Sequence, residues 1–166
     1  MRVSSPFFRK SVYTLWVLLV LTAAWPMFRF IDKAEGQTSP NSELQTIPIT
    51  LGNRTIHAVV ADTDESRIRG LLGWERITEG LGMLVDFETQ AKYAIHMQGM
   101  KFPIDAVWID RKGEIKLIYQ SIVPNSGLIY PSMFPARYCL EIKAGFCKKY
   151  GIKTGQSVQF GVPGKR

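Results

Sequence analysis

Residues 93–110 read YAIHMQGMKFPIDAVWID, and this stretch decides the predicted fold. Residues of strand composition lie on each side of a short segment that contains a glycine, which is typical of two β-strands joined as a hairpin. With a four-residue turn at residues 98–101, Met97 would lie opposite Phe102, and one face of the hairpin would be apolar throughout. The stretch therefore predicts a β-rich domain.

The same register places His96 and Asp105 on the second face of the hairpin, as diagonal neighbours. Diagonal Cα atoms in a sheet are about 7–8 Å apart, so the two side chains could meet directly or through a water. Such a pair can act in acid-base catalysis, because the carboxylate orients the imidazole and raises its basicity. It can equally be structural, because a carboxylate in an apolar strand needs a partner.

The flanking sequence predicts further short strands and little helix. Residues 47–61 indicate two strands joined at Gly52 and Asn53, and the DTDE segment at 62–65 resembles a capping box before a short helix. Strand composition recurs at residues 83–87, 114–123, 137–144 and 156–162. Together these segments predict one mostly β domain over residues 47–162, a small closed barrel or two-sheet sandwich with one or two short helices.

The N-terminus predicts a membrane anchor. Residues 1–10 are basic and are expected in the cytoplasm, residues 11–28 carry no charge, and 18 helical residues reach about 27 Å. We expect a transmembrane signal-anchor at 11–30, a flexible linker at 31–46, and the domain on the extracytoplasmic side. Cleavage after Ala24 is the alternative, although the bulky residues at 25–28 disfavour it.

Charge and motifs exclude several classes of function. Five of the 21 basic residues precede residue 37, and residues 37–166 carry 16 basic and 12 acidic side chains, so no nucleic-acid partner is expected. The chain has no phosphate-binding loop, GxSxG or HExxH motif. Met83, Met97 and Met100 with His96 would suit copper(I), but Met97 occupies a core position, so neither metal nor cofactor is expected.

A candidate site draws on three distant segments. Asp105, in a strand apolar on both sides, needs a cation or several donors, and Arg67 is suited to a bidentate pair. Glu141 lies on the face of its strand opposite Leu140 and could join the same polar pocket. The candidate binding residues are Arg67, His96, Asp105 and Glu141, and the last three are also the catalytic candidates. A Cys139–Cys147 disulfide is expected from the even cysteine count in an exported domain.

Five segments carry a family resemblance: ADTDESRIRGLLG, GMLVDF, HMQGMKFPIDAVWID, YCLEIKAG and KYGIKTGQSV. In order and spacing they resemble the prokaryotic family called domain of unknown function 192, or UPF0127, over nearly all of residues 47–160. The resemblance implies a compact β-rich domain and no established activity. The motif positions it carries over are Arg67, Gly70, Leu71, Gly82, Met83, Met97, Pro103, Asp105, Glu141 and Gly145.

Three functional hypotheses follow. The first is a non-catalytic binding or accessory module at the outer face of the membrane, with an unknown small-molecule or envelope ligand. The second is a small hydrolase or lyase acting on a carbohydrate or cell-envelope substrate, with Asp105 or Glu141 as base and His96 as acid. The third is a structural subunit of a membrane complex, which would expose an apolar patch.

Overall fold

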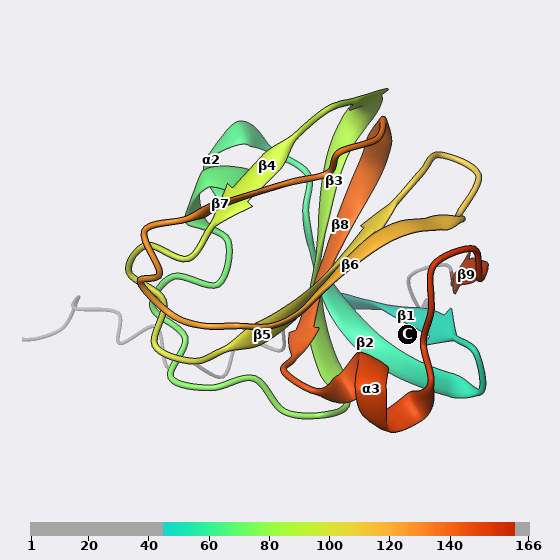
Figure 1. The fold of residues 1–166 in the computed structure, drawn as a ribbon, viewed down its shortest axis with the longest axis horizontal. Helices are drawn as coiled ribbons and strands as arrows, with labels where there is room; N and C mark the ends of the chain where they lie inside the picture. The colour runs from blue at the N-terminus through green and yellow to red at the C-terminus, as the bar shows by residue number, and fades with distance from the viewer. Residues whose placement is uncertain (1–44, 162–166) are drawn as a thin grey trace, which may run out of the picture. The chain divides into compact units, whose positions relative to one another are not determined.

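The fold is mostly β, as predicted, and is built on one curled sheet of seven strands (Figure 1). The computed structural model describes residues 45–161. Along the sheet the strand order is β6-β5-β8-β3-β2-β1-β9, and β4 and β7 form a separate two-stranded sheet. The strands are β1 (Thr46–Leu51), β2 (Arg54–Ala61), β3 (Leu81–Ala91), β4 (Ala94–His96), β5 (Ile104–Ile109), β6 (Ile115–Ile122), β7 (Ile129–Pro131), β8 (Ala136–Lys143) and β9 (Val158–Phe160), and the helices are α2 (Asp64–Arg69) and α3 (Phe146–Tyr150).

The predicted membrane anchor at 11–30 and the basic segment at 1–10 lie outside the described residues. Nearly all of the predicted linker, 31–46, does so too. Within residues 45–161, neither helix is long and apolar enough to cross a bilayer.

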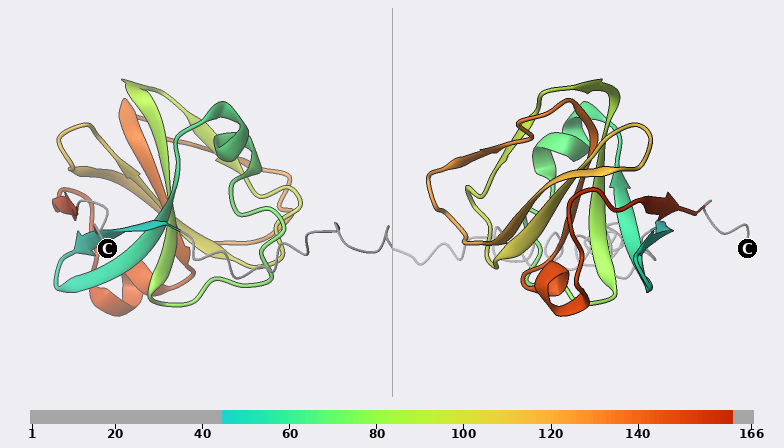
Figure 2. Two further views of the ribbon diagram at one scale, coloured as in Figure 1. Left: turned by 180° about the vertical axis from the view of Figure 1, so that it is seen from behind. Right: turned by 45° about the vertical axis from the view of Figure 1, so that its right-hand side comes forward.

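The large sheet curls into a half-barrel rather than the predicted closed barrel or two-sheet sandwich (Figure 2). Its edge strands β6 and β9 form no ladder with each other, and one isolated bridge, between Glu114 and Ser157, lies next to them. Beside this bridge, the Val158 amide donates to the Gly113 carbonyl at 2.8 Å. Gly113 has φ of +86°, and a Cβ there would lie 2.8 Å from the Val158 carbonyl oxygen, so this close approach requires glycine.

Each face of the large sheet buries its own apolar cluster. One face packs against α3 and the segment that follows it, and this barrel-side cluster includes Leu84, Val107, Leu140 and Phe146. The opposite face packs against Leu71 and the β4–β7 sheet, and its cluster includes Met83, Trp108 and Tyr130. Central strands are therefore buried on both faces, and all six residues of β5 are buried.

The predicted hairpin at residues 93–110 is wrong in its pairing. β4 pairs with β7, so that His96 lies opposite Ile129, whereas β5 lies between β6 and β8. The predicted grouping of apolar side chains is nevertheless confirmed, because Met97 and Ile104 belong to the same cluster. Alternation along the chain identified the faces of the strands but not their partners.

Two other local predictions are confirmed in substance. β1 and β2 form an antiparallel hairpin around Gly52 and Asn53, with Leu51 opposite Arg54. A capping box starts α2 one residue later than expected: the Thr63 side chain accepts from the Ser66 amide, and the Ser66 hydroxyl accepts from the Thr63 amide. β2 and β3 are parallel, which the sequence did not predict.

Asp105 is fully buried and is held by backbone amides, not by His96 or Arg67 as predicted. One carboxylate oxygen accepts from the amides of Ser121 at 2.8 Å and Gly145 at 2.9 Å, and the other accepts from Cys147 at 2.8 Å. A register shift between β5 and β6 opposite Asp105, where Ser121 has φ of +50°, accompanies the first of these bonds. Asp105 thus ties β5 to β6 and to the start of α3.

The predicted Cys139–Cys147 disulfide is also wrong, because both thiols are free and buried. Cys139 belongs to the cluster on the Trp108 face of the sheet, whereas Cys147, in α3, belongs to the barrel-side cluster. The sheet lies between the two thiols. Burial raises the pKa of both thiols, which keeps them protonated.

Replacing Asp105 with asparagine is expected to lower the free energy of unfolding by about 2–4 kcal/mol, because one acceptor oxygen becomes a donor that faces an amide donor. Urea unfolding of Asp105→Asn measures the loss. Asp110→Asn is the matched control: Asp110 accepts from the amides of Lys112 and Glu114 in a partly exposed turn, and about 1 kcal/mol is expected there. An unchanged midpoint for Asp105→Asn would contradict the structural role.

Candidate functional site

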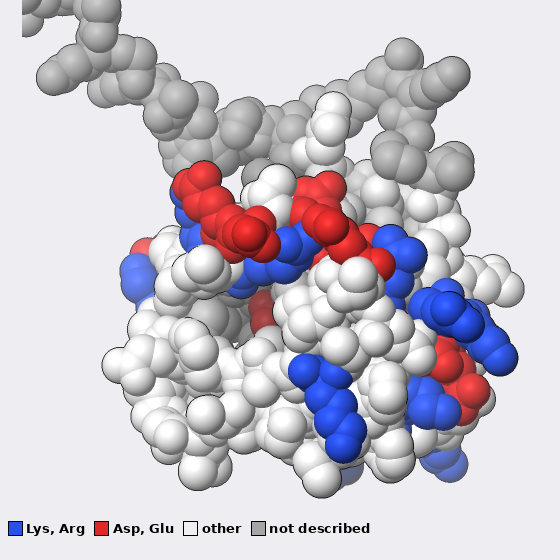
Figure 3. Space-filling model, turned by 90° about the horizontal axis from the view of Figure 1, so that it is seen from above, with Lys and Arg blue, Asp and Glu red and all other residues white. Residues whose placement is uncertain are grey.

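A pocket of about 280 Å³ opens on the face of the sheet that carries Met83 and Trp108. It lies between α2 with the segment that follows it, the β4 strand and the large sheet. Figure 3 shows it as a hollow with an acidic group at its floor. Its lining residues come from residues 67–72, β3, residues 94–100, β5 and β8.

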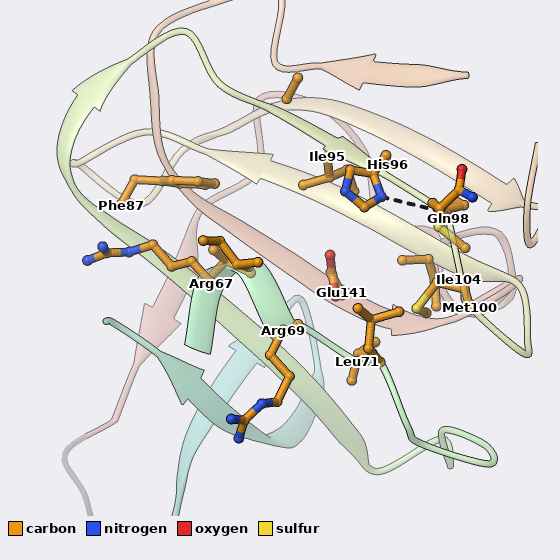
Figure 4. A pocket seen from close by; sticks show the side chains of 16 residues that line it. Arg67, Arg69, Leu71, Phe87, Ile95, His96, Gln98, Met100, Ile104 and Glu141 are labelled. Atoms are coloured by element: carbon orange, nitrogen blue, oxygen red, sulfur yellow. Dashed lines mark hydrogen bonds between the residues drawn. The ribbon is translucent and has the colours of Figure 1, made fainter. Parts of the chain in front are cut away.

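Glu141 is the carboxylate of this pocket and points into it from β8 (Figure 4). Its neighbours across the sheet are Met83 on β3 and Ala106 on β5, so no charged group lies beside it in these strands. The residue is only 8 % exposed, and burial raises the pKa of its carboxyl to about 7. Among the described residues, no side chain or amide donates a hydrogen bond to it.

The walls of the pocket are apolar and partly aromatic. Phe87 stacks on Tyr93, with ring centroids 4.0 Å apart and an interplanar angle of 9°, and also stacks on Trp108 at 5.9 Å. This sandwich holds the Phe87 ring in place as one wall. The other apolar walls are formed by Leu71, Leu72, Val85, Ile95, Met97, Met100 and Ile104.

Arg67 lines the pocket but is committed to structural bonds. Its guanidinium donates to the Asp86 carbonyl at 2.7 Å and to the Asp62 carbonyl at 2.5 Å, and it pairs with Asp64 and Glu88. These bonds attach α2 to β3. The neighbouring Arg69 pairs with Glu65 within α2. Neither guanidinium is therefore directed to Glu141.

His96 lies at the pocket wall on β4 and is exposed. Its Nδ1 atom accepts from the Gln98 amide at 3.3 Å, the dashed line of Figure 4. In the neutral ring the proton is therefore on Nε2, which remains available to a ligand. His96 and Glu141 come from different sheets and meet only through the pocket.

Three of the four predicted binding residues line this one pocket: Arg67, His96 and Glu141. Asp105 does not, because neighbouring residues of a strand point to opposite faces and Asp105 faces α3. Asp105 is thus removed from the catalytic candidates. Within residues 45–161, no group of three or more His, Cys, Asp or Glu side chains is arranged to hold a metal.

The sequence analysis did not predict the apolar walls of the pocket. It gives Phe87 and Ile95 no functional role, places Met97 in the core, and names Met100 only as a possible metal ligand. The available signal was the apolar character of Met97, Met100 and Ile104 around the turn, since all three line the pocket. Leu71 follows α2 in the family motif and forms part of the opposite wall.

Comparison with known proteins identifies the family. The model of the DUF192 family, described as an uncharacterized ACR, matches residues 47–160. The chain belongs to the DUF192 family. A UPF0127 protein of Thermococcus gammatolerans is 26 % identical over 110 residues, which cover 66 % of this chain and 70 % of that protein. UPF0127 protein TK1120 of Thermococcus kodakarensis is 25 % identical over 101 residues, covering 61 % and 62 %.

Two solved structures resemble the domain. A proposed transcription regulator from Sinorhizobium meliloti has a TM-score of 0.65 and 25 % identity, over 69 % of this chain and 92 % of that one. A protein of unknown function from Novosphingobium aromaticivorans has a TM-score of 0.68 and 24 % identity, over 72 % and 89 %. Because the match covers nearly all of each solved chain, a polypeptide scarcely longer than this domain folds on its own.

The raised pKa of Glu141 predicts a pH-dependent stability. The carboxyl ionises near pH 4.5 when unfolded and near 7 when folded, so the folded state binds more protons between these values. The contribution of Glu141 to the free energy of unfolding is therefore highest below pH 4.5, and it falls by about 3 kcal/mol as pH rises to 7.

Urea unfolding of wild type and Glu141→Gln across this range measures the effect. As pH rises, the free energy of unfolding of Glu141→Gln should increase steadily relative to that of wild type. The exposed Glu75→Gln control should follow wild type. Parallel pH profiles for wild type and Glu141→Gln would contradict the prediction.

Proposed function

We propose that this protein is an exported accessory module, anchored in the cytoplasmic membrane, whose domain binds a small molecule in the Glu141 pocket. One observation carries the binding role: a buried carboxyl without a partner lies at the floor of an open, mostly apolar pocket. A buried carboxyl that stabilises nothing in the fold is costly, and such groups concentrate at functional sites. Small-molecule sites typically combine apolar walls with a few polar groups in this way.

Membrane attachment rests on the sequence. Residues 11–28 are uncharged and follow Arg2, Arg9 and Lys10, which favours an N-terminus retained in the cytoplasm. The domain adds one supporting feature, since five of its seven exposed large apolar side chains lie within residues 123–134: Val123, Leu128, Ile129, Met133 and Phe134. An exposed apolar segment is typical of a surface that meets a membrane or another protein.

A nucleic-acid role is not part of the proposal, although one structural relative is described as a transcription regulator. α2 has six residues and α3 has five, too short to serve as a recognition helix in a major groove. Basic side chains on α2 are also paired with acids, which removes the uniform positive surface that phosphates require.

Acid-base catalysis is the second candidate, and the pKa of Glu141 near 7 favours it. Glu141 would act as base and His96 as acid, on a carbohydrate or cell-envelope substrate. Glycoside hydrolysis usually needs two carboxyl groups, and Glu141 is the only carboxylate that lines the described pocket. A lyase reaction with one base is therefore the version that fits the pocket.

A bulky side chain at the pocket wall should block binding. Ala94 lines the pocket from an exposed position on β4, so Ala94→Trp should reduce the affinity of pocket ligands by at least about tenfold without unfolding the domain. Hits from a fragment library, detected by NMR shifts of pocket residues, provide the ligands. Lys92→Trp, exposed and outside the pocket lining, is the matched control. A library without a pocket ligand, or equal affinities for Ala94→Trp and wild type, would refute the binding role.

The full chain should remain in the membrane fraction after an alkaline wash, because residues 11–28 are long enough to span the hydrocarbon core. Protease added outside intact spheroplasts should degrade the domain. N-terminal sequencing of the membrane-bound protein should begin at or next to Met1. A sequence that begins after Ala24 would instead show that the segment is a cleaved signal peptide.

A further inference from the structure

The Glu141 pocket contains a negative group for which the described chain supplies no positive partner. Arg67 is saturated by the Asp62 and Asp86 carbonyls and by Asp64 and Glu88, as described above. Arg69 pairs with Glu65. Both arginines line the pocket, but each is paired with a carboxylate that does not line it. A ligand must therefore bring its own donor to Glu141.

The walls around Glu141 suit the hydrocarbon body of a small ligand. The Phe87 ring, stacked on Tyr93 and Trp108, forms one of these apolar walls. Met97 and Met100 add polarizable thioethers that tolerate varied apolar shapes. The pocket volume of about 280 Å³ is close to the lower end of small-molecule sites, which limits the ligand to a small body.

We propose that the pocket binds a small organic amine, with its ammonium group at Glu141 and its apolar body against Phe87, Met97 and Met100. This inference rests on the small-molecule binding proposed above and specifies the ligand class. The ammonium group would supply the hydrogen bonds and the positive charge that Glu141 lacks. A charge-assisted bond of this kind is strong in a pocket shielded from water.

Binding should strengthen as pH rises, because only the ionised Glu141 attracts a cation. The titratable or charged groups that face Glu141 are few: α2 contributes Arg67 and Arg69, β4 contributes His96, and β8 contributes Cys139, whereas the pocket residues of β3 and β5 are apolar.

Matched pairs of ligands test the inference on the domain of residues 43–166. Benzylamine with benzyl alcohol, and isobutylamine with isobutanol, have nearly equal shapes and differ in charge, since primary amines stay protonated up to about pH 9. At about pH 8 each amine should bind at least about tenfold more tightly than its alcohol. This preference should largely disappear at about pH 5.5, where Glu141 is protonated.

Glu141→Gln should remove the preference for amines at both pH values, and circular dichroism confirms that the variant is folded. Glu75→Gln removes one negative charge that does not line the pocket and should keep the preference, which separates an effect of Glu141 from one of net charge. Equal binding of amine and alcohol, or an amine preference that survives in Glu141→Gln, would overturn the inference.

The outcomes also separate this inference from the proposed function. If the fragment library yields neutral or anionic pocket ligands while no amine binds, the amine inference fails and the binding role stands. If neither the library nor the amines yields a ligand that Ala94→Trp displaces, both fail.

Discussion

The fold depends on the way Asp105 is satisfied. Its carboxylate lies near the start of a strand buried on both faces, and no cation reaches it within the described residues. Three backbone amides from three later points of the chain meet it instead. The bulge at Ser121 in β6 and the left-handed Gly145 before α3 both serve this arrangement. A single buried charge thereby fixes an edge of the half-barrel and the helix that covers one face.

The two buried carboxylates of neighbouring strands differ in their hydrogen bonding. Asp105 and Glu141 lie one register position apart, since Ala106 is opposite Glu141 and Asp105 is opposite Ile142. Asp105 faces the barrel-side cluster and accepts three amides, whereas Glu141 faces the pocket and accepts none. The contrast distinguishes a carboxylate that stabilises the fold from one that is available to a ligand. The fold gains stability from Asp105 and retains Glu141 at a cost, which is the pattern expected of a site kept for a ligand.

Sequence reasoning recovered features that depend on neighbouring residues. The β1–β2 hairpin follows from Gly52 and Asn53, and the start of α2 follows from a capping box, because both signals are local. Membership of Arg67, His96 and Glu141 in one site was also predicted. Arg67 and Glu141 were supported by the family resemblance, which places both among the motif positions, and not by the strand pattern.

Strand partners could not be predicted in the same way. The segment at 93–110 has the strand composition of a hairpin, but β5 gains more contacts between β6 and β8 than β4 could offer. β7 is three residues long and ends in a proline, so it gave no strand signal, although it is the partner that removes β4 from the hairpin. The mistaken His96–Asp105 pair followed directly from that pairing error.

The strand order also governs when the domain can form. β8, which begins at Ala136, lies between β5 and β3 and pairs with both, so that it connects the β6-β5 pair to β3-β2-β1. Until β8 has been synthesised, the described sheet consists of two unconnected parts, each with apolar faces uncovered. Contacts so distant in sequence make folding slow and late. For a chain proposed to cross a membrane, this delay is useful, because a translocation channel accepts an unfolded polypeptide and this domain cannot complete its sheet early.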